Sequence, residues 1–491
     1  MEAFVSKYVR EQKRYTKNDL RALFCFSEEE IQTFIRRLKA YGVMKAVKNT
    51  PLQKDLSDLA DEDLAVTDDA TEGNAFFYVF TFVGVLTVGN RVIKCYPKYI
   101  TQNPEPMEEM KQTIKVLQRY GSKEQIINMY NGNGQNSSFN LLAVMLFLLD
   151  DFHQHGFYIN SEDIVELNGE GPILWNQTID NGFAIISNNR PYYVDLYTHR
   201  SVDDENDFFY HLHKCVVTEC SNQLRDAGIL DLFDMVEADI SDETRSNLGD
   251  DDYILYRLQS ELNIQYNTHK QVLLKTMYAY IAHRRTLADN VGISMYGTTS
   301  FNLVWEDVCK EVFGDCLNIQ LRNLKLPNGI AEGYHPTDQL INIIERPKWQ
   351  GYRENGQPFE KEAADTLIPD IIALTDLDGI HSFIILDAKY YCVQLEPNKM
   401  LRGQPGIGDV TKQYLYQLAY KQFIEDHGIE DIKNCFLMPT EQDSIIKKGT
   451  ARLNMLEQLN LQNIQIRLLP AKKMFRYYLE KQKMNIAELQ L

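Results

Sequence analysis

Two aspartates and a lysine in the last third of the chain have the residue types and the spacing of a hydrolytic metal site. Asp370 follows Pro369, and after sixteen further residues Asp387 begins the triplet Asp-Ala-Lys, which ends at Lys389. Two carboxylates that converge on one point repel each other unless a cation lies between them, and their hard oxygen ligands suit Mg²⁺ or Mn²⁺. A bound divalent ion lowers the pKa of a coordinated water and neutralises charge that develops on a phosphodiester. Asp370, Asp387 and Lys389 are therefore the candidate catalytic residues, with Lys389 placed to hold the attacking water.

The residues around this triad predict a β-hairpin that brings the two aspartates together. Each aspartate lies in a strongly apolar run, and the runs 366–374 and 381–391 are separated by Asp376-Leu377-Asp378-Gly379. An Asp-Gly step between two apolar runs is a strong hairpin signal. Strand alternation then places Asp387 and Lys389 on one face. The competing interpretation is a buried hairpin that ends in an ordinary Asp–Lys pair, because short Asp-x-Lys matches are common by chance.

This arrangement resembles the PD-(D/E)XK nucleases, with Asp387 in place of the glutamate that many of them carry. The resemblance implies an α/β fold with a central mixed sheet flanked by helices, and Mg²⁺ as cofactor, for which Mn²⁺ is expected to substitute. It also implies that Asp370, Asp387 and the backbone carbonyl of Ala388 bind the metal. The expected strands of this nuclease domain, which is predicted to span residues 291–491, are 340–345, 368–374, 383–390, 434–438 and 464–468.

Two predicted helices flank this core. In the segment 409–420, positions 413, 416, 417 and 420 recur at helical spacing and share one face. Nucleases of this superfamily often carry such a Gln/Tyr helix beside the active site, which implies a catalytic role for Gln413 and DNA contacts for Lys412 and Tyr416. The segment 301–313 reads as an amphipathic helix, and the resemblance favours Glu306 over Glu311 as a residue that assists the metal. The alternative for Glu306 is a solvated helix face.

Three further stretches extend the resemblance to a particular family. Residues 171–179 (GPILWNQTI), 297–306 (GTTSFNLVWE) and 412–416 (KQYLY) together look like the LlaJI family of restriction endonucleases, which is related to McrC. The likeness covers roughly residues 75–480. It implies a restriction function and a separate McrB-like AAA+ NTPase partner, either a GTPase or an ATPase, within a hetero-oligomeric complex.

Composition bounds these expectations. The chain has 491 residues and a net charge of −18, which opposes autonomous tight binding to DNA and suits delivery by a partner. Its eight cysteines lack a Cys-x-x-Cys pair, which favours reduced thiols in the cytoplasm over a zinc ribbon or an iron–sulfur cluster. No apolar run is long enough to cross a bilayer, and the N-terminus lacks the pattern of a signal peptide, so no membrane contact is expected.

The N-terminal residues 1–53 predict a basic, winged-helix-like unit. A capping box at Ser27-Glu28-Glu29-Glu30 starts an amphipathic segment, and the pattern indicates three short helices followed by a strand at 43–47. Arg36, Arg37 and Lys39 on the capped helix are the candidate DNA-binding residues. A partner-docking role for the unit is an equally supported alternative.

The middle of the chain predicts an acidic linker or loop at 54–74 and an α+β partner-interaction region at 75–290. Strands are expected at 76–83 and 85–96, with a turn at Gly89-Asn90, and helices at 112–120, 140–152, 207–225 and 253–285. The polar loop 130–137 lacks the Lys-Ser/Thr of a P-loop, so any NTPase is expected on another chain. His211 and His213 are two apart in a predicted helix and diverge, so no metal is assigned to them or to His269.

Three functions remain open from the sequence. The leading hypothesis is a metal-dependent DNA endonuclease that acts as the nuclease subunit of an NTP-dependent restriction system against foreign DNA. The second is an assembly or activating subunit for an AAA+ NTPase, with cleavage secondary. The third is a nuclease of repair or recombination, which the core motif alone does not separate from restriction.

Overall fold

The computed structural model describes residues 4–48, 76–121, 140–282, 293–377 and 379–491. The predicted acidic stretch 54–74 and the polar loop 130–137 lie outside these ranges. The chain divides into two compact units, which are described separately. One consists of Met1–Phe4 and Phe139–Ser294, and the other, called the sheet unit here, of Val5–Ser138 and Met295–Leu491.

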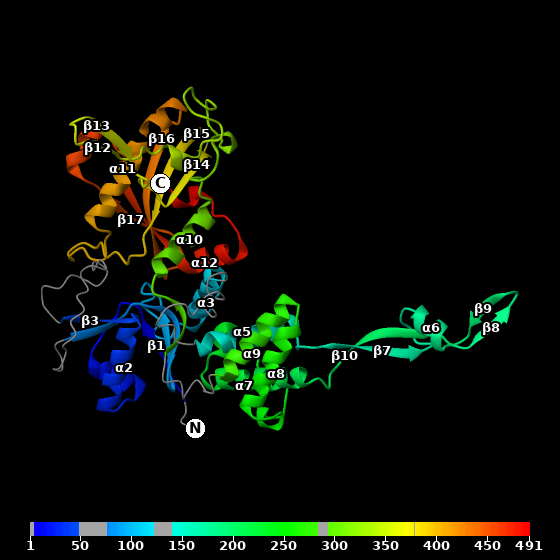
Figure 1. The fold of residues 1–491 in the computed structure, drawn as a ribbon. Helices are drawn as coiled ribbons and strands as arrows, with labels where there is room; N and C mark the ends of the chain where they lie inside the picture. The colour runs from blue at the N-terminus through cyan, green and yellow to red at the C-terminus, as the bar shows by residue number, and fades with distance from the viewer. Residues whose placement is uncertain (1–3, 49–75, 122–139, 283–292, 378) are drawn as a thin grey trace. The chain divides into compact units, whose positions relative to one another are not determined.

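The sheet unit begins with two small sheets (Figure 1). The first has the order β1-β6-β5-β11, with bounds Val5–Arg10, Arg91–Tyr96, Val83–Val88 and Ile293–Thr298. The predicted turn at Gly89-Asn90 is confirmed, because Val88 pairs with Arg91 across it. The second sheet has the order β2-β4-β3, with bounds Arg14–Tyr15, Phe76–Phe80 and Met44–Lys48.

The N-terminal segment differs from the expected three helices. It contains two helices, α1 (Lys17–Phe24) and α2 (Glu28–Ala40), and the predicted capping box is present, with Ser27 accepting from the backbone N–H of Glu30. The residues before them form strand β1, which pairs in parallel with β6. Val9 of β1 is fully buried, and its packing in the sheet favours an extended strand over the helix that was expected there. Strand β1 therefore joins residues 5–10 to residues 91–96 in one sheet.

A five-stranded mixed sheet forms the C-terminal part of this unit (Figure 1). Its order is β14-β15-β16-β18-β17, with bounds Ile371–Leu377, Ile380–Ala388, Asp431–Thr440, Ile464–Pro470 and Ile446–Ala451. Strand β15 pairs antiparallel with β14 and parallel with β16, and β18 pairs parallel with β16 and antiparallel with β17. The central mixed sheet expected from the sequence is thus present.

Helices pack on this sheet. Helix α11 (Ile407–Asp426) places Tyr420 and Phe423 against Phe383 of β15 in one buried cluster. Helix α10 has the predicted bounds, Phe301–Phe313, and packs against α12 (Ala471–Glu480) through Trp305 and Phe475. Helix α3 (Met107–Gly121) packs on α10 and α12. Short 3-10 turns complete the unit at Leu321–Asn323, Leu340–Ile343, Asn454–Leu459 and Ile486–Leu489.

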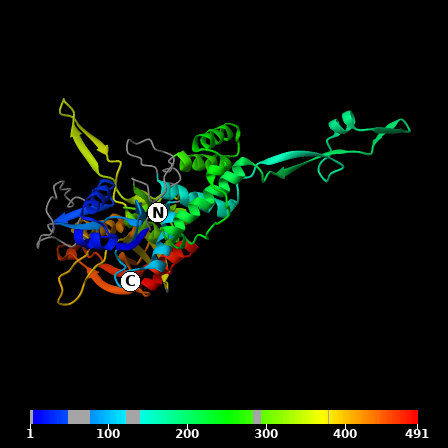
Figure 2. The ribbon, with the colours of Figure 1, turned by 90° about the horizontal axis from the view of Figure 1, so that it is seen from below.

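The strand predicted at 340–345 is wrong. Residues Leu340–Ile343 form a 3-10 turn, in which Leu340 and Ile344 are buried. Their spacing of four suits a helical turn, and Tyr420 donates a hydrogen bond to the Leu340 carbonyl at 3.1 Å, a bond that a sheet ladder would have taken. The next residues form a hairpin that was not predicted, β12 (Lys348–Tyr352) and β13 (Pro358–Glu362), which projects with Trp349 and Tyr352 exposed (Figure 2).

The other unit contains helices at the predicted ranges 140–152, 207–225 and 253–285, together with strands that were not predicted. Its helices are α5 (Leu141–His155), α7 (Phe208–Asp226), α8 (Asp251–Ile264) and α9 (Thr268–Ala282), with 3-10 turns at Leu230–Phe233 and Arg245–Asn247. The region predicted as helical at 253–285 is two helices, because the chain leaves the helix at Gln265. None of the described helices is both long and apolar enough to span a membrane.

A long β-arm extends from these helices (Figures 1 and 2). Its stem is the antiparallel pair β7 (Ser161–Leu167) and β10 (Tyr197–Asp203), and its tip carries α6 (Trp175–Asn181), β8 (Ala184–Ser187) and β9 (Arg190–Tyr193). The arm is closed at its base by the hydrogen bond from Asp204 N–H to the Asn160 carbonyl at 2.9 Å. Many of its apolar side chains are exposed, among them Trp175, Ile179, Phe183, Ile186, Tyr192 and Val194.

Candidate active site

The β14–β15 hairpin brings the two predicted aspartates together. Ile371 pairs with Leu386, so Asp370, one residue earlier, comes opposite Asp387, one residue later. Side chains directly opposite each other on antiparallel strands lie on the same face. The Oδ2 atom of Asp370 also accepts a hydrogen bond from the backbone N–H of Ala388 at 3.0 Å, which fixes this carboxylate at the end of β15. The predicted hairpin and the convergence of its aspartates are confirmed.

Lys389 lies between two carboxylates. Its ammonium is 2.9 Å from Asp387 Oδ1 and 3.2 Å from Asp409 Oδ1 in the first turn of α11. The other oxygen of Asp409 accepts from the backbone N–H of Gly406, which begins the helix. Asp409 therefore ties the start of α11 to Lys389, a contact that the sequence reasoning missed. Asp409 is the third residue after the N-cap Gly406 of the Gln/Tyr helix, and this position in the sequence could have identified it.

The electrostatics of the site reflect crowded and buried carboxylates. Burial raises the pKa of Asp370 to about 8, and the hydrogen bond with Asp387 and its charge act in the same direction. Burial lowers the pKa of Lys389, but the negative charges of Asp387, Asp409 and Asp370 outweigh this effect, so the pKa is raised overall. Without another cation, the site thus favours a protonated Asp370 and a firmly charged lysine.

These residues fit a hard divalent cation. Asp387 is only 3% exposed, and its Oδ1 atom makes no hydrogen bond within the described part of the chain, although the lysine ammonium lies close. Two buried carboxylates that converge on one point repel each other, and a divalent cation between them relieves this repulsion more fully than one lysine does. Asp370 and Asp387 are therefore suitable ligands for Mg²⁺ or Mn²⁺, while the part of the Ala388 carbonyl stays a prediction.

The α11 residues lie on the predicted face but are packed. Gln413 is fully buried, and its Nε2 atom donates to the Ile385 carbonyl of β15 at 3.4 Å, while its Oε1 atom makes no hydrogen bond with the described residues. Tyr416 is 6% exposed and donates to the Ile368 carbonyl at 2.9 Å. Both side chains thus brace the strands that carry the aspartates. Lys412 is exposed. The roles of Gln413 in catalysis and of Lys412 and Tyr416 in DNA contact stay predictions.

Glu306 on α10 forms an ion pair with Lys310, one helical turn later. Burial lowers the pKa of Lys310, but its hydrogen bond with Glu306 and the charges of Glu306, Asp370 and Asp315 raise it overall. Lys310 is therefore a second cation in the electrostatic field of the aspartates, which sequence reasoning missed. The assignment of Glu306 to the metal stays a prediction.

The basic residues of α2 spread around the helix. Arg36 is exposed, whereas Arg37 and Lys39 are half-buried. Arg37 lines a hollow of about 350 Å³ together with Phe26, Phe34 and Arg91 from the β5–β6 hairpin. The three residues therefore do not form one flat basic surface, and their contact with DNA stays a prediction.

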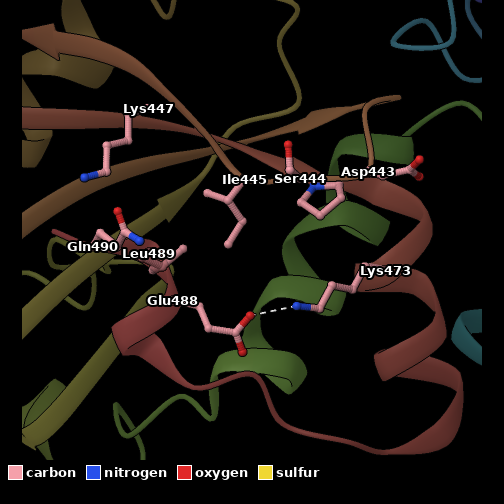
Figure 3. Close-up of a pocket in the computed structure, with 9 residues that line it drawn as sticks. Asp443, Ser444, Ile445, Lys447, Lys473, Glu488, Leu489 and Gln490 are labelled. Carbon is pink, nitrogen blue, oxygen red and sulfur yellow. Dashed lines mark hydrogen bonds and ion pairs between the residues drawn. The ribbon is translucent and has the colours of Figure 1, made fainter.

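A larger hollow lies elsewhere in the sheet unit (Figure 3). It measures about 430 Å³ and is lined by the loop before β17, the start of α12 and the C-terminal residues 488–490. Lys473 and Glu488 form an ion pair at 2.7 Å beside it. It shares none of its lining residues with the site around Asp370 and Asp387.

Comparison with known proteins defines the class to which this fold and site belong. A family model described as LlaJI restriction endonuclease matches residues 82–332 and 333–471. The chain therefore belongs to the LlaJI restriction endonuclease family, and the resemblance found in the sequence is confirmed. It is similar to the type II restriction enzyme BsuMI component YdjA of Bacillus subtilis (strain 168), with 26% identity over 419 residues, which are 84% of this chain and 83% of that protein.

Two solved structures are also similar. The first is a half-complex from a tetradecameric assembly of Thermococcus gammatolerans McrB AAA+ hexamers with bound McrC, at 13% identity, a TM-score of 0.36 and coverage of 97% of this chain and 99% of that chain. The second is the Thermococcus gammatolerans McrBC complex, at 13% identity, a TM-score of 0.24 and coverage of 61% and 84%. Both TM-scores are below 0.5, so no function is drawn from these likenesses.

Proposed function

We propose that the chain is a metal-dependent DNA endonuclease of the PD-(D/E)XK type, acting as the nuclease subunit of an NTP-dependent restriction system. The observation that supports it most strongly is the convergence of Asp370, Asp387 and Lys389 at the end of one hairpin. Membership of a restriction endonuclease family directs this chemistry to DNA.

The residues of the chain have distinct roles in the proposed reaction. Asp370 and Asp387 would hold Mg²⁺, which when bound supplies a Lewis acid for phosphodiester hydrolysis. The Ala388 N–H donates a hydrogen bond to the Asp370 carboxylate, which holds this carboxylate in place before the metal binds. The Lys389 ammonium would hold the attacking water or neutralise charge on the phosphate, and Asp409 keeps it directed at the site.

Metal binding tests this assignment separately from cleavage. Calorimetric titration with Mn²⁺ should show binding in the wild-type chain that is lost in Asp370→Asn and Asp387→Asn, because each change removes an anionic ligand. Gln413→Ala should retain the binding, since its amide nitrogen already donates to Ile385 and an amide is a poor ligand beside two carboxylates. Unchanged Mn²⁺ binding in Asp387→Asn would reject the site.

We also propose that an AAA+ NTPase partner binds the exposed β-arm at residues 161–203. Exposed apolar side chains in a contiguous region mark interaction surfaces, and Phe183 at the tip is 80% exposed. The acidic chain lacks a recognisable nucleotide-binding loop in its sequence, so NTP-driven movement requires another protein. The exposed β-arm therefore favours a second function for the same protein, the binding and activation of an AAA+ NTPase.

Deletion of the arm tests the partner proposal. Because Asn160 and Asp204 are hydrogen-bonded at its base, the residues between them can be replaced by a short Gly-Ser linker without separating the flanking helices. We expect the deleted chain to keep the melting temperature of the wild type but to lose co-elution with the McrB-like AAA+ NTPase. Phe183→Ser should weaken the complex, whereas Ser201→Ala on the exposed stem is a matched control. Retention of the complex without the arm would contradict the proposal.

A further inference from the structure

A cluster of two histidines and an aspartate lies in the mainly helical unit and contains none of the residues assigned to cleavage. Asp151 and His155 are one turn apart at the end of α5, and His269 is in the first turn of α9. The Oδ1 atom of Asp151 is 3.2 Å from His155 Nδ1 and 2.6 Å from His269 Nε2. The two imidazole rings are stacked at an angle, with centroids 4.3 Å apart.

The geometry of this cluster suits a metal ion. One potential ligand atom from each of the three residues lies within 4.8 Å of the others. Ligand atoms about 2.1 Å from a tetrahedral zinc ion are about 3.4 Å apart, so small side-chain rotations would close the set. The side chains of His155 and His269 are 51% and 42% exposed, which leaves an approach for an ion and for water.

The buried carboxylate supplies an independent indication. Asp151 is only 5% exposed, and its Oδ2 atom has no hydrogen-bond partner among the described residues. Nearby, His213 is fully buried and accepts a hydrogen bond on Nδ1 from the Tyr158 N–H, which places its proton on Nε2. A protonated nitrogen is a donor and cannot bind a metal, so His213 is excluded as a ligand. The unsatisfied oxygen of Asp151 therefore lacks a partner that a cation would supply.

We propose that Asp151, His155 and His269 bind a divalent transition-metal ion of the zinc class, with water in the remaining coordination position. Two imidazoles and one carboxylate are borderline ligands, which favour Zn²⁺ over the Mg²⁺ expected at the all-oxygen site of Asp370 and Asp387. The bound ion would join the end of α5, the helix that precedes the β-arm, to the start of α9. Residue spacing hid this site, because His269 is more than a hundred residues from Asp151.

Zinc titration of the full chain tests the proposal. The titration is done by calorimetry with ZnCl₂ in the Asp387→Ala background, so that the cleavage site does not contribute. We expect one zinc ion per chain, and we expect His155→Ala and His269→Ala each to weaken binding at least tenfold, because loss of even an outer-sphere partner of a metal costs that much. His153→Ala is the matched control, since this exposed histidine on the same helix contacts the Val236 carbonyl instead.

A spectroscopic measurement distinguishes the proposed site from adventitious binding to surface histidines. Co²⁺ in place of Zn²⁺ should give visible absorption that is lost in His155→Ala and His269→Ala and kept in His153→Ala. Equal weakening in all three variants, or zinc affinity unchanged by the loss of His155, would overturn the proposal. Asp151→Asn should also weaken zinc binding, because it removes the anionic ligand. His155→Ala with Asp387 intact should still cleave DNA in Mg²⁺, so loss of zinc binding is separated from the nuclease assignment.

Discussion

At the scale of single residues, the site depends on how carboxylates and a lysine neutralise one another. Asp387 lies in β15 and Lys389 directly follows the strand, with its ammonium 2.9 Å from Asp387 Oδ1. Asp409 comes from a helix twenty residues further along, and it is this residue that completes the environment of Lys389. A lysine held between two carboxylates keeps its charge and its direction, which is what a residue that positions water or phosphate requires.

The first prediction concerns Asp409 as a positioning residue. Asp409→Asn removes one of the two charges that direct Lys389 but leaves both proposed metal ligands. We expect the DNA cleavage rate to fall about 10- to 100-fold, because small misplacement of a catalytic group has effects of that size, while Mn²⁺ binding is retained. Glu425→Gln, an exposed change at the other end of α11, is the control. Loss of Mn²⁺ binding in Asp409→Asn would show that Asp409 is itself a ligand.

The second prediction concerns a buried hydrogen bond behind the site. Glu11, just after β1, accepts from the hydroxyl of Tyr390 at 2.6 Å, and Tyr390 directly follows Lys389. Burial raises the pKa of Glu11 above its ordinary value of 4.5, although the charge of Lys98 and the hydrogen bond from Tyr390 oppose the shift. The folded state therefore holds this proton more tightly than the unfolded state does, and stability is lost as the pH rises from 4.5 through the raised pKa.

Glu11→Gln removes this pH-dependent loss while keeping the acceptor oxygen. The melting temperature of Glu11→Gln relative to wild type should therefore be higher at pH 8 than at pH 5. Glu108→Gln, an exposed change on α3, serves as the control. If the difference in melting temperature between Glu11→Gln and wild type is the same at both pH values, the pKa of Glu11 is not raised by folding.

At the scale of elements, the sequence correctly predicted the helices and strands whose apolar residues form one continuous buried face. The bounds of α10 were predicted at both ends, because its apolar stripe runs from Phe301 to Phe313 and Gly314 follows with a positive φ. The β14–β15 hairpin was predicted in place, although its strands are shifted by two or three residues toward the turn at Gly379.

Elements without a buried face of their own escaped prediction. Strands β7 and β10 of the arm are largely exposed and lack strict alternation, and the aromatic residues of β12 and β13 contact little of the core. The segment at Leu340 has strand-like composition, but its two buried positions and the hydrogen bond from Tyr420 select a helical turn. In the site, Asp409 and Lys310 were missed because their contacts depend on how helices dock onto the sheet, which residue spacing does not specify.

The third prediction concerns the docking of α11. Tyr416→Phe removes the hydrogen bond to the Ile368 carbonyl while the ring stays in the core. We expect a loss of about 1 kcal/mol in the free energy of unfolding, together with a cleavage rate lowered only a few fold, because Ile368 is two residues from Asp370. Urea unfolding followed by tryptophan fluorescence measures the first quantity. If Tyr416 instead contacts DNA, its loss would raise the dissociation constant for DNA and leave stability unchanged.

At the scale of the whole molecule, the chain combines the proposed nuclease site and the proposed partner-binding arm with a strongly acidic charge. A net charge of −18 opposes approach to DNA unless another protein supplies the attraction. We therefore predict that the isolated chain cleaves DNA slowly or undetectably, and that cleavage requires NTP hydrolysis by the partner. Rapid NTP-independent cleavage by the isolated chain would separate the nuclease from the proposed restriction complex and favour the repair interpretation.

The measurement that tests the central claim most directly is plasmid cleavage in Mg²⁺, with the neighbouring NTPase and its nucleotide present, by wild type and by Asp387→Ala. We predict double-strand cleavage with 5′-phosphate ends by the wild type and none by the variant, although the variant still folds and still binds the NTPase. Asp431→Ala, which removes a carboxylate from the far end of the neighbouring strand β16, should cleave as the wild type does. Cleavage by Asp387→Ala at the wild-type rate would contradict the assignment of the active site.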